Sequence, residues 1–529
     1  MIYKKNIITF IIILIGALFF SCQIDKNVDR QNKVELIEND SRGLNGNATL
    51  KVISDDSLAL KRVHFGGLHL LGNSSSDRYI RTYLKDTTIV TILNLEKPQI
   101  VFFSGLGLNI NYMSYFLISP GDSVLLSIKN KQLVISGKNS AHYNFYPKID
   151  STYTAYWYVP YKDDLKDYKK RIKESYLKRK QFFNSYIEKH NVTDDFKTIM
   201  SAKIQHEYLY YLMAPTKVKM KYNGRFIYIN DFDNFLKEEI KKNNIEKDGL
   251  FDIGDYFDHV SVEDFNKPKL LNNHFFRANL VFFIRQYFLD SDYENYSKSK
   301  FLEEKKFIQD NFEEEIETFA IARLLLDYHK NSFGLSKESN ELLKQTIDTY
   351  YERFSKDDSY KEKIDELKQS LDNIESKLSD ELLQIKLIDI KGDTLSLAEV
   401  FNKSKNKIKI IDFWASWCLP CVDEVQKSQN VRNELAKNNN LDLIYFSIDE
   451  KKLSWLKTSR KWAKYGMLNN QYLIPNFKST ELYHYLKVKS IPRYVIFNKQ
   501  NEIIIEDGPR PTDSIRFRQV LNEALDKSW

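Results

Sequence analysis

The spacing of hydrophobic residues changes twice along the chain and divides it into three parts. Between about residues 48 and 145, short apolar runs separated by turn residues predict the strands of a small antiparallel β domain. From about 150 to 380, apolar residues recur at steps of three and four, as they do on the buried face of amphipathic helices. From 381 to 529, apolar strands alternate with helical segments, which predicts an α/β sheet with some parallel pairing. The pattern therefore predicts a multidomain protein.

Individual elements follow from the same patterns. In the N-terminal part we expect strands at residues 91–93, 100–103, 124–128 and 133–135. In the middle part, the clearest helical series are Leu165, Tyr168, Ile172 and Tyr176; Phe312, Ile316, Phe319 and Leu326; and Ile364, Leu367, Leu371, Ile374 and Leu378. In the C-terminal part we expect a β-hairpin over 385–395, strands at 408–413, 443–447, 494–497 and 502–505, and helices after residue 421, through Trp455 and Trp462, and over 514–525.

Composition narrows the class of protein. The 529 residues are too many for one hydrophobic core, and 42% hydrophobic with 29% charged residues is typical of globular domains. The net charge is +7, from 79 basic and 72 acidic residues, and no basic block stands apart from acidic neighbours. This balance gives no reason to expect a nucleic-acid partner.

The N-terminus has the features of an export signal. Lys4 and Lys5 precede a mainly apolar run over residues 7–20. As a helix this run would be about 21 Å long, shorter than the roughly 30 Å hydrocarbon core of a bilayer. We therefore expect a signal peptide over residues 1–21, with an uncleaved anchor helix as the alternative.

The ending Ser21-Cys22 resembles a bacterial lipobox, whose cysteine is acylated and becomes the mature N-terminus. The resemblance implies that Cys22 is lipidated and anchors the chain to a membrane outside the cytoplasm. Residues 22–47 are polar and aperiodic, which predicts a flexible tether. We therefore expect a lipid-anchored protein of the cell envelope that faces the periplasm or the cell surface.

Beyond Cys22 the chain has only two cysteines, Cys418 and Cys421. A protein that used disulfides for stability would distribute more of them, so this pair indicates redox chemistry. The pair lies between a predicted strand and a predicted helix, where unsatisfied N–H groups and the helix dipole stabilise a thiolate. We expect Cys418 to be the exposed, attacking thiol and Cys421 to be the shielded, resolving thiol.

Other uses of the two cysteines fit less well. Zinc needs four ligands, and the only histidine near the pair in sequence is His484, so no metal and no cofactor are expected. A purely structural disulfide would close a very small loop and gain little chain entropy.

Residues 412–421, Asp-Phe-Trp-Ala-Ser-Trp-Cys-Leu-Pro-Cys, closely resemble the thioredoxin active-site segment. The preceding hairpin and Glu424 resemble the membrane-tethered TlpA/ResA-like branch of the AhpC/TSA-related family. Residues 490–497 look like the cis-proline loop and following strand of that fold. Residues 119–124 resemble a β-rich domain that precedes thioredoxin-like domains in Bacteroidetes lipoproteins. The resemblance implies a thioredoxin fold for residues 381–529 and says nothing about residues 150–380.

Two acidic residues are candidates for proton transfer. Asp412 lies in an apolar strand, so we expect it to be buried with a raised pKa, and the matching residue of thioredoxins is assigned a role as proton carrier for the resolving thiol. Glu424 lies one helical turn after Cys421 on the same face. The TlpA/ResA-like branch carries an acid there that tunes the thiols. The alternative for either acid is that it only caps or solvates the start of the helix.

The remaining candidates would bind substrate. The resemblance implies a cis bond before Pro492, which would present the backbone of Ile491 to an extended substrate strand. An ordinary trans proline at the start of a strand is the alternative. Trp417 is expected to pack around the site and to contact substrate. Leu419 and Arg493 stand where thioredoxins commonly have Gly and Thr, so redox potential and substrate preference do not follow from the resemblance.

Two classes of function remain. The first is a tethered thiol–disulfide oxidoreductase that reduces disulfide-containing envelope proteins. A membrane thiol reductant of the DsbD type would then reduce the cysteine pair of the oxidoreductase again. The second is a binding or scaffold lipoprotein in which the first 380 residues hold a partner and the redox domain is auxiliary. The expected architecture is a small N-terminal β domain, an α-helical middle region and a C-terminal α/β thioredoxin fold.

Overall fold

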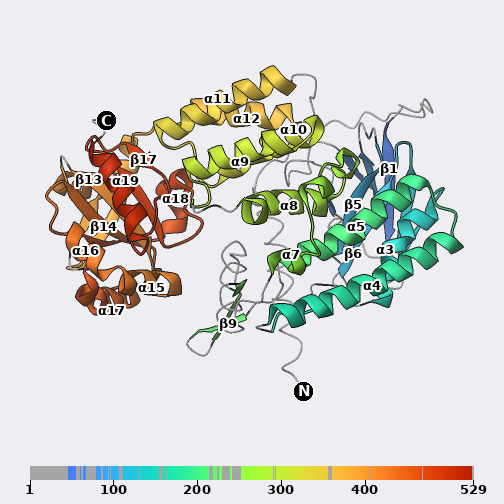
Figure 1. Ribbon diagram of the computed structural model, residues 1–529, viewed down its shortest axis with the longest axis horizontal. Coiled ribbons are helices and arrows are strands. Elements are labelled where there is room, and N and C mark those ends of the chain that lie inside the picture. Colours follow the sequence, from blue (N-terminus) through green and yellow to red (C-terminus); the bar gives the residue numbers. More distant parts are fainter. Residues whose placement is uncertain are drawn as a thin grey trace. The chain divides into compact units, whose positions relative to one another are not determined.

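The computed structural model describes residues 46–526 with gaps, of which the longest cover 67–78, 229–238 and 241–251 (Figure 1). The predicted signal peptide, Cys22 and nearly all of the predicted tether lie outside the described residues. The chain divides into two compact units, Met1–Gln286 and Tyr287–Trp529. Within the described part, no helix is long and apolar enough to cross a membrane.

The first unit begins with two β-sheets. The five-stranded sheet has the order β3-β4-β1-β7-β8 and the smaller sheet has the order β2-β5-β6. Their strands are β1 (Ala48–Ser54), β2 (His64–Gly66), β3 (Tyr79–Tyr83), β4 (Thr87–Ile92), β5 (Gln99–Leu106), β6 (Asn111–Ile118), β7 (Ser123–Lys129) and β8 (Gln132–Gly137). One apolar core includes Leu50 and Leu126 of the first sheet and Phe103 and Phe116 of the second. The two sheets therefore bury a common interior.

The expectation of an entirely antiparallel β domain was wrong at one pair of strands. β1 and β7 are parallel, with Thr49 opposite Ser123 and Ser54 opposite Ile128. The antiparallel neighbours β7 and β8 are consecutive in sequence, so their direction follows from the short turn between them. β1 and β7 lie far apart in the chain, and no local signal fixes their relative direction.

Helices follow the sheets and confirm the predicted helical middle region. In the first unit they are α3 (Ser140–Thr152), α4 (Leu165–Lys189), α5 (Asp194–Met213), α7 (Ile253–Tyr256) and α8 (His274–Phe283), together with a small hairpin of β9 (Lys219–Tyr222) and β10 (Arg225–Tyr228). Asp164 caps α4 by accepting hydrogen bonds from the N–H groups of Lys166 and Asp167. Leu165, Tyr168 and Ile172 are buried, as their spacing predicts.

The second unit contains α9 (Lys298–Asn311), α10 (Glu314–Lys330), α11 (Lys337–Phe354) and α12 (Lys361–Asp372). The helix expected to reach Leu378 ends six residues earlier, because α12 is capped at Asn373. Leu378 is nevertheless buried, in the core of the C-terminal sheet. Leu378 is apolar because it packs in the core of the C-terminal sheet. The helical spacing of apolar residues therefore continues past the end of α12.

The C-terminal sheet has seven strands in the order β12-β11-β15-β14-β13-β16-β17 (Figure 1, orange to red). The strands are β11 (Lys386–Asp389), β12 (Thr394–Ser396), β13 (Ile408–Trp414), β14 (Leu441–Ser447), β15 (Gln471–Leu473), β16 (Arg493–Phe497) and β17 (Ile503–Ile505). β13, β14 and β15 are parallel neighbours, and the remaining pairs are antiparallel. This arrangement confirms a mixed α/β domain, although β15 was not predicted.

Two apolar clusters cover the two faces of this sheet. One includes residues of α15 (Leu419–Lys427), α16 (Gln429–Leu435), α17 (Lys452–Trp462) and α19 (Ser514–Asp526). The other includes residues of α14 (Leu397–Lys403) and α18 (Glu481–Leu486). Every residue of β13 is buried, so this interior strand holds the start of the segment after Trp414 in a fixed position.

The end of β8 offers a test of the sheet geometry. Gly137 has φ +148°, and a Cβ there would lie 2.6 Å from the backbone oxygen of Ser123, whereas Gly121 has φ +79° and open space around it. We expect Gly137→Ala to lower the free energy of unfolding of the β domain by about 2–4 kcal/mol and Gly121→Ala by about 1–2 kcal/mol. Hydrogen exchange of the β7 and β8 amides in urea measures both. Equal losses in the two variants would contradict the steric argument.

Candidate active site

A disulfide between Cys418 and Cys421 lies at the start of α15, directly after β13. Cys418 is the N-cap residue of that helix, and its Sγ accepts a hydrogen bond of 3.1 Å from the backbone N–H of Cys421. Pro420 occupies the first helical turn, where a missing N–H has no cost. The sulfur of Cys418 therefore takes the place of the oxygen that usually caps a helix.

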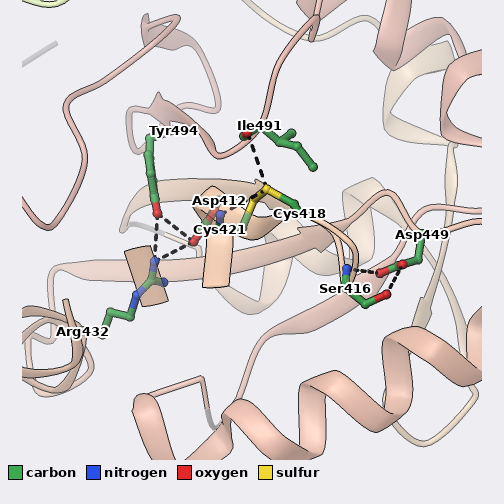
Figure 2. Close-up of a disulfide and its surroundings, with 8 residues drawn as sticks. All are labelled: Asp412, Ser416, Cys418, Cys421, Arg432, Asp449, Ile491 and Tyr494. Carbon is green, nitrogen blue, oxygen red and sulfur yellow. Dashed lines mark hydrogen bonds and ion pairs between the residues drawn. A yellow bond between two sulfur atoms is a disulfide. The ribbon is translucent and has the colours of Figure 1, made fainter. Parts of the chain in front are cut away.

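Both cysteines are buried in this oxidised state, with 4% of Cys418 and 1% of Cys421 exposed. The expectation that Cys418 is exposed was therefore wrong, although it is the more accessible of the two. The carbonyl oxygen of Ile491 lies 3.6 Å from Sγ of Cys418 (Figure 2). Trp417, with 56% of its surface exposed, is the large apolar side chain at the surface beside the disulfide.

The loop before β16 brings Ile491 to the disulfide. The Ile491–Pro492 peptide bond is cis, as the resemblance implied. β16 pairs with β13 in antiparallel register, with Arg493 opposite Phe413 and Tyr494 opposite Asp412. Because β13 leads directly to Cys418, this register places the proline loop next to the disulfide. Pro492 is buried and Ile491 is partly exposed.

Asp412 is buried beneath the site and is paired. Its Oδ2 accepts hydrogen bonds from the Arg432 guanidinium at 2.9 Å and from the Tyr494 hydroxyl at 3.1 Å. Arg432 also donates to the Tyr494 hydroxyl at 2.8 Å, and its side chain is 0% exposed against 1% for Asp412. Figure 2 shows these three side chains on the same side of the disulfide as Cys421.

Burial raises the pKa of Asp412 above its usual 3.8, and the charge of Arg432 with the hydrogen bonds from Arg432 and Tyr494 offsets part of that rise. The expected burial and raised pKa are thus confirmed, but the partners were not predicted. Within the described part of the chain, Oδ1 of Asp412 has no hydrogen-bond partner. That oxygen can accept a proton without breaking the contacts of Oδ2.

Glu424 is the second buried acid of the site. Its Oε1 accepts from the backbone N–H of Thr512 at 2.9 Å, and its Oε2 accepts from the Thr512 hydroxyl at 2.7 Å. Burial raises its pKa, and the two hydrogen bonds offset part of the rise. Glu424 therefore joins α15 to the segment before α19 and does not lie free on the helix surface.

The loop between β13 and Cys418 is held by Asp449, which the sequence analysis missed. Asp449 accepts from the backbone N–H of Ser416 at 2.8 Å and from the Ser416 hydroxyl at 2.5 Å (Figure 2). It also accepts from the Ser447 hydroxyl at 2.8 Å. A signal for this contact existed, because β13 and β14 are parallel and Trp414 lies opposite Ser447. The residues after two such strands meet at the same edge of the sheet.

The structure brings together all the predicted site residues of the C-terminal domain. Asp412 lies on β13, Cys421 and Glu424 lie on α15, and Cys418 is the N-cap residue of α15. Trp417 lies on the loop between β13 and α15, and Ile491 and Pro492 lie on the loop before β16. Their roles in catalysis remain predictions. Arg432 and Tyr494 are additional members of the site. Arg432 lies on α16, outside any motif, so only the fold reveals its contact with Asp412.

Comparisons with known proteins found a family model and several solved structures that match part of the chain. A family model described as thioredoxin-like matches residues 406–503. Solved structures that match include the thioredoxin domain of a thiol-disulfide oxidoreductase from Bacteroides vulgatus (20% identity, 28% of this chain and 99% of that chain, TM-score 0.22). Others are a thiol-disulfide oxidoreductase from Bacteroides fragilis (21%, 26% and 95%, 0.23) and a thiol:disulfide interchange protein from a Bacteroides species (20%, 29% and 95%, 0.23).

A search of curated proteins found no match. The family match, together with the sheet order and the disulfide, confirms the predicted thioredoxin-like domain with a CxxC motif. A disulfide at a CxxC motif in this fold is the arrangement that the predicted class of domain, that of thiol–disulfide oxidoreductases, requires.

The buried ion pair between Asp412 and Arg432 predicts how stability depends on pH when the arginine is removed. Arg432→Met leaves Asp412 buried without its cation, which should raise the pKa of Asp412 further. Since the folded state then binds this proton more tightly than the unfolded state, stability falls as pH rises from the unfolded value of 3.8 through the folded pKa. We expect a loss of about 3–5 kcal/mol at neutral pH and a much smaller loss near pH 4, measured by urea unfolding.

The double variant Asp412→Asn/Arg432→Met is the matched control, because it removes both charges. It should lose less stability at neutral pH than Arg432→Met and should lack the additional pH dependence. If both variants lost the same amount at both pH values, the Asp412–Arg432 pair would not be the source of the effect.

Proposed function

We propose that the chain is a membrane-tethered thiol–disulfide oxidoreductase that exchanges disulfides with envelope proteins and acts mainly as a reductase. The observation that carries the proposal is the Cys418–Cys421 disulfide at the N-terminus of α15, with the Ile491 carbonyl 3.6 Å from the sulfur of Cys418. A sulfur that caps a helix and lies beside a partly exposed backbone edge is suited to attack an extended substrate.

The reaction takes two exchanges. The Cys418 thiolate attacks one sulfur of the substrate disulfide, so that one S–S bond forms as another breaks and the released sulfur takes up a proton. The Cys421 thiol then loses its proton and attacks Cys418, which forms the internal disulfide and releases the second substrate thiol. Two electrons pass to the substrate, and the observed disulfide is the product state.

The environment of each sulfur supports this order of events. The N–H of Cys421 that reaches Sγ of Cys418 would donate to a thiolate in the reduced state, and the start of α15 adds a favourable dipole. Cys421 has less exposed surface than Cys418, so external disulfides meet Cys418 first. Cys418 is therefore the proposed nucleophile and Cys421 the resolving thiol.

Asp412 and Glu424 are the proposed proton carriers. A carboxyl whose pKa burial has raised exchanges protons at a pH closer to that of a thiol than an ordinary carboxyl does. The unpaired Oδ1 makes Asp412 the stronger candidate to receive the proton of Cys421. Glu424 would act from the same helix as the two thiols, although its two hydrogen bonds to Thr512 also give it a structural role.

Substrate would bind over Trp417 and along Ile491. The exposed indole offers an apolar, rigid contact beside the disulfide, and Pro492 fixes the backbone of Ile491 towards Cys418. The reductant would be a membrane dithiol of the DsbD type, and Cys22 would hold the chain at the membrane. These last two parts of the proposal rest on the family resemblance and the lipobox-like sequence.

Reduction of insulin by the full chain with dithiothreitol tests the proposal. We expect turnover above the rate of dithiothreitol alone for the wild type, and a fall to that background rate for Cys418→Ser, because the attacking sulfur is lost. Cys22→Ser is the matched control, since it makes the same substitution far from Cys418 in the sequence and should keep wild-type turnover. A wild type without thiol-dependent turnover would instead favour a scaffold lipoprotein with an auxiliary redox domain.

A further inference from the structure

The turn between α10 and α11, residues 331–336, packs against the segment that carries Ile491. The Ser332 hydroxyl donates to the carbonyl oxygen of Leu486 at 2.9 Å. In the opposite direction, Lys487 Nζ donates to the carbonyl oxygen of His329 at 3.0 Å. Leu335 lies in the same apolar cluster as Leu486 and Val488. Hydrogen bonds and apolar contacts thus join this turn to the residues immediately before the proline loop.

Glu506, at the end of β17, holds the same turn from a second side. One carboxylate oxygen, Oε1, accepts from the backbone N–H groups of Gly334 at 3.2 Å and Ser336 at 2.9 Å. It also accepts from the hydroxyls of Ser336, at 3.0 Å, and Ser339. Four donors on one buried carboxylate oxygen define its position closely.

Arg493 connects these contacts to the proline loop. Its side chain is buried, and Nε and one terminal nitrogen donate to the backbone oxygen of Glu506 at 3.1 and 2.8 Å. The other terminal nitrogen donates to the backbone oxygen of Lys487 at 3.2 Å. Lys487 and Arg493 are the two ends of the loop that contains Ile491 and Pro492, so the guanidinium joins the ends across its base.

We propose that Arg493 and Glu506 are positioning residues through which the α10–α11 turn holds the proline loop in register with Cys418. We call the contacts of Glu506 and Arg493 the loop brace. The inference rests on the proposed function, in which Ile491 forms part of the substrate-binding edge. It also gives a use to the arginine that stands where thioredoxins commonly have threonine, and it assigns the helices before the C-terminal sheet a part in substrate binding.

The physical reason is that exchange needs accurate placement of the substrate backbone. A displacement of about 1 Å at a positioning group can cost two orders of magnitude in rate. The loop brace supplies three hydrogen bonds from one planar guanidinium, which a lysine or a threonine cannot reproduce. The contacts of the loop brace join Glu506 and Arg493 to the turn and to Lys487 and include neither sulfur atom. Its loss should therefore affect protein substrates more than a small dithiol.

Two variants weaken the loop brace at different places. Ser336→Ala/Ser339→Ala removes two of the four donors to Glu506, and Arg493→Thr removes the connection between Glu506 and Lys487. Arg493→Lys keeps the charge and should restore part of the activity. Thr346→Ala is the control, because Thr346 is buried on α11. Its hydroxyl donates to the carbonyl oxygen of Leu342 in that helix and accepts from Lys305 of α9, and neither contact involves the turn.

The readout compares insulin with a small molecule. For the first two variants we expect kcat/KM for insulin to fall about tenfold, mainly through KM, while the rate at which dithiothreitol reduces the Cys418–Cys421 disulfide stays within about twofold of wild type. Thr346→Ala should leave both rates near wild type. If insulin and dithiothreitol rates fell together, or if insulin rates did not change, the positioning role would be wrong.

A second measurement does not depend on activity. Hydrogen exchange of the amides of residues 488–491 should be faster in Ser336→Ala/Ser339→Ala than in Thr346→Ala, because only the former loosens the base of the loop. Unchanged exchange in that segment would overturn the inference even if the wild type reduced insulin. Faster exchange in a protein without insulin turnover would support the loop brace and contradict the proposed function.

Discussion

The hydrogen bond from the N–H of Cys421 to the sulfur of Cys418 is the contact on which the rest of the site depends. It exists because β13 ends just before a helix whose cap residue is a cysteine. The surrounding groups hold that geometry from outside the helix: Asp449 fixes the loop at Ser416, and the proline loop brings the carbonyl of Ile491 to the same sulfur. The hydrogen bond to the sulfur of Cys418 therefore depends on α15 beginning directly after that residue.

The site also contains two buried carboxyl groups, and their partners differ. Asp412 is paired with a buried arginine and a tyrosine, while Glu424 is hydrogen-bonded to Thr512. An unpaired buried charge costs several kcal/mol, so these partners are what allow the acids to lie near the disulfide. Because one oxygen of Asp412 keeps no partner among the described residues, the pairing leaves that carboxyl able to accept a proton.

Sequence patterns predicted the strands β13, β14 and β16, the helix after Cys421 and the residues around the disulfide, because apolar runs and a short motif encode them locally. They missed contacts made by residues far apart in the chain: the parallel pairing of β1 and β7, Arg432 on Asp412, and Asp449 on Ser416. The end of α12 was misplaced because Leu378, which continues the helical spacing, packs in the core of the C-terminal sheet and not on the helix. The exposure of Cys418 was overestimated, since its place at the start of a helix does not show that Cys418 is buried or that the carbonyl oxygen of Ile491 lies 3.6 Å from its sulfur.

In the proposed reaction, Cys418 attacks the disulfides of other proteins and Cys421 resolves the mixed disulfide. The most direct measurement is to express the full chain as Cys421→Ala in its host and to look for adducts by non-reducing electrophoresis. The account predicts mixed disulfides that dithiothreitol releases and that disappear in Cys418→Ser/Cys421→Ala, in which Cys22 is the only cysteine left. Absence of adducts in Cys421→Ala, or their persistence in the double variant, would contradict it.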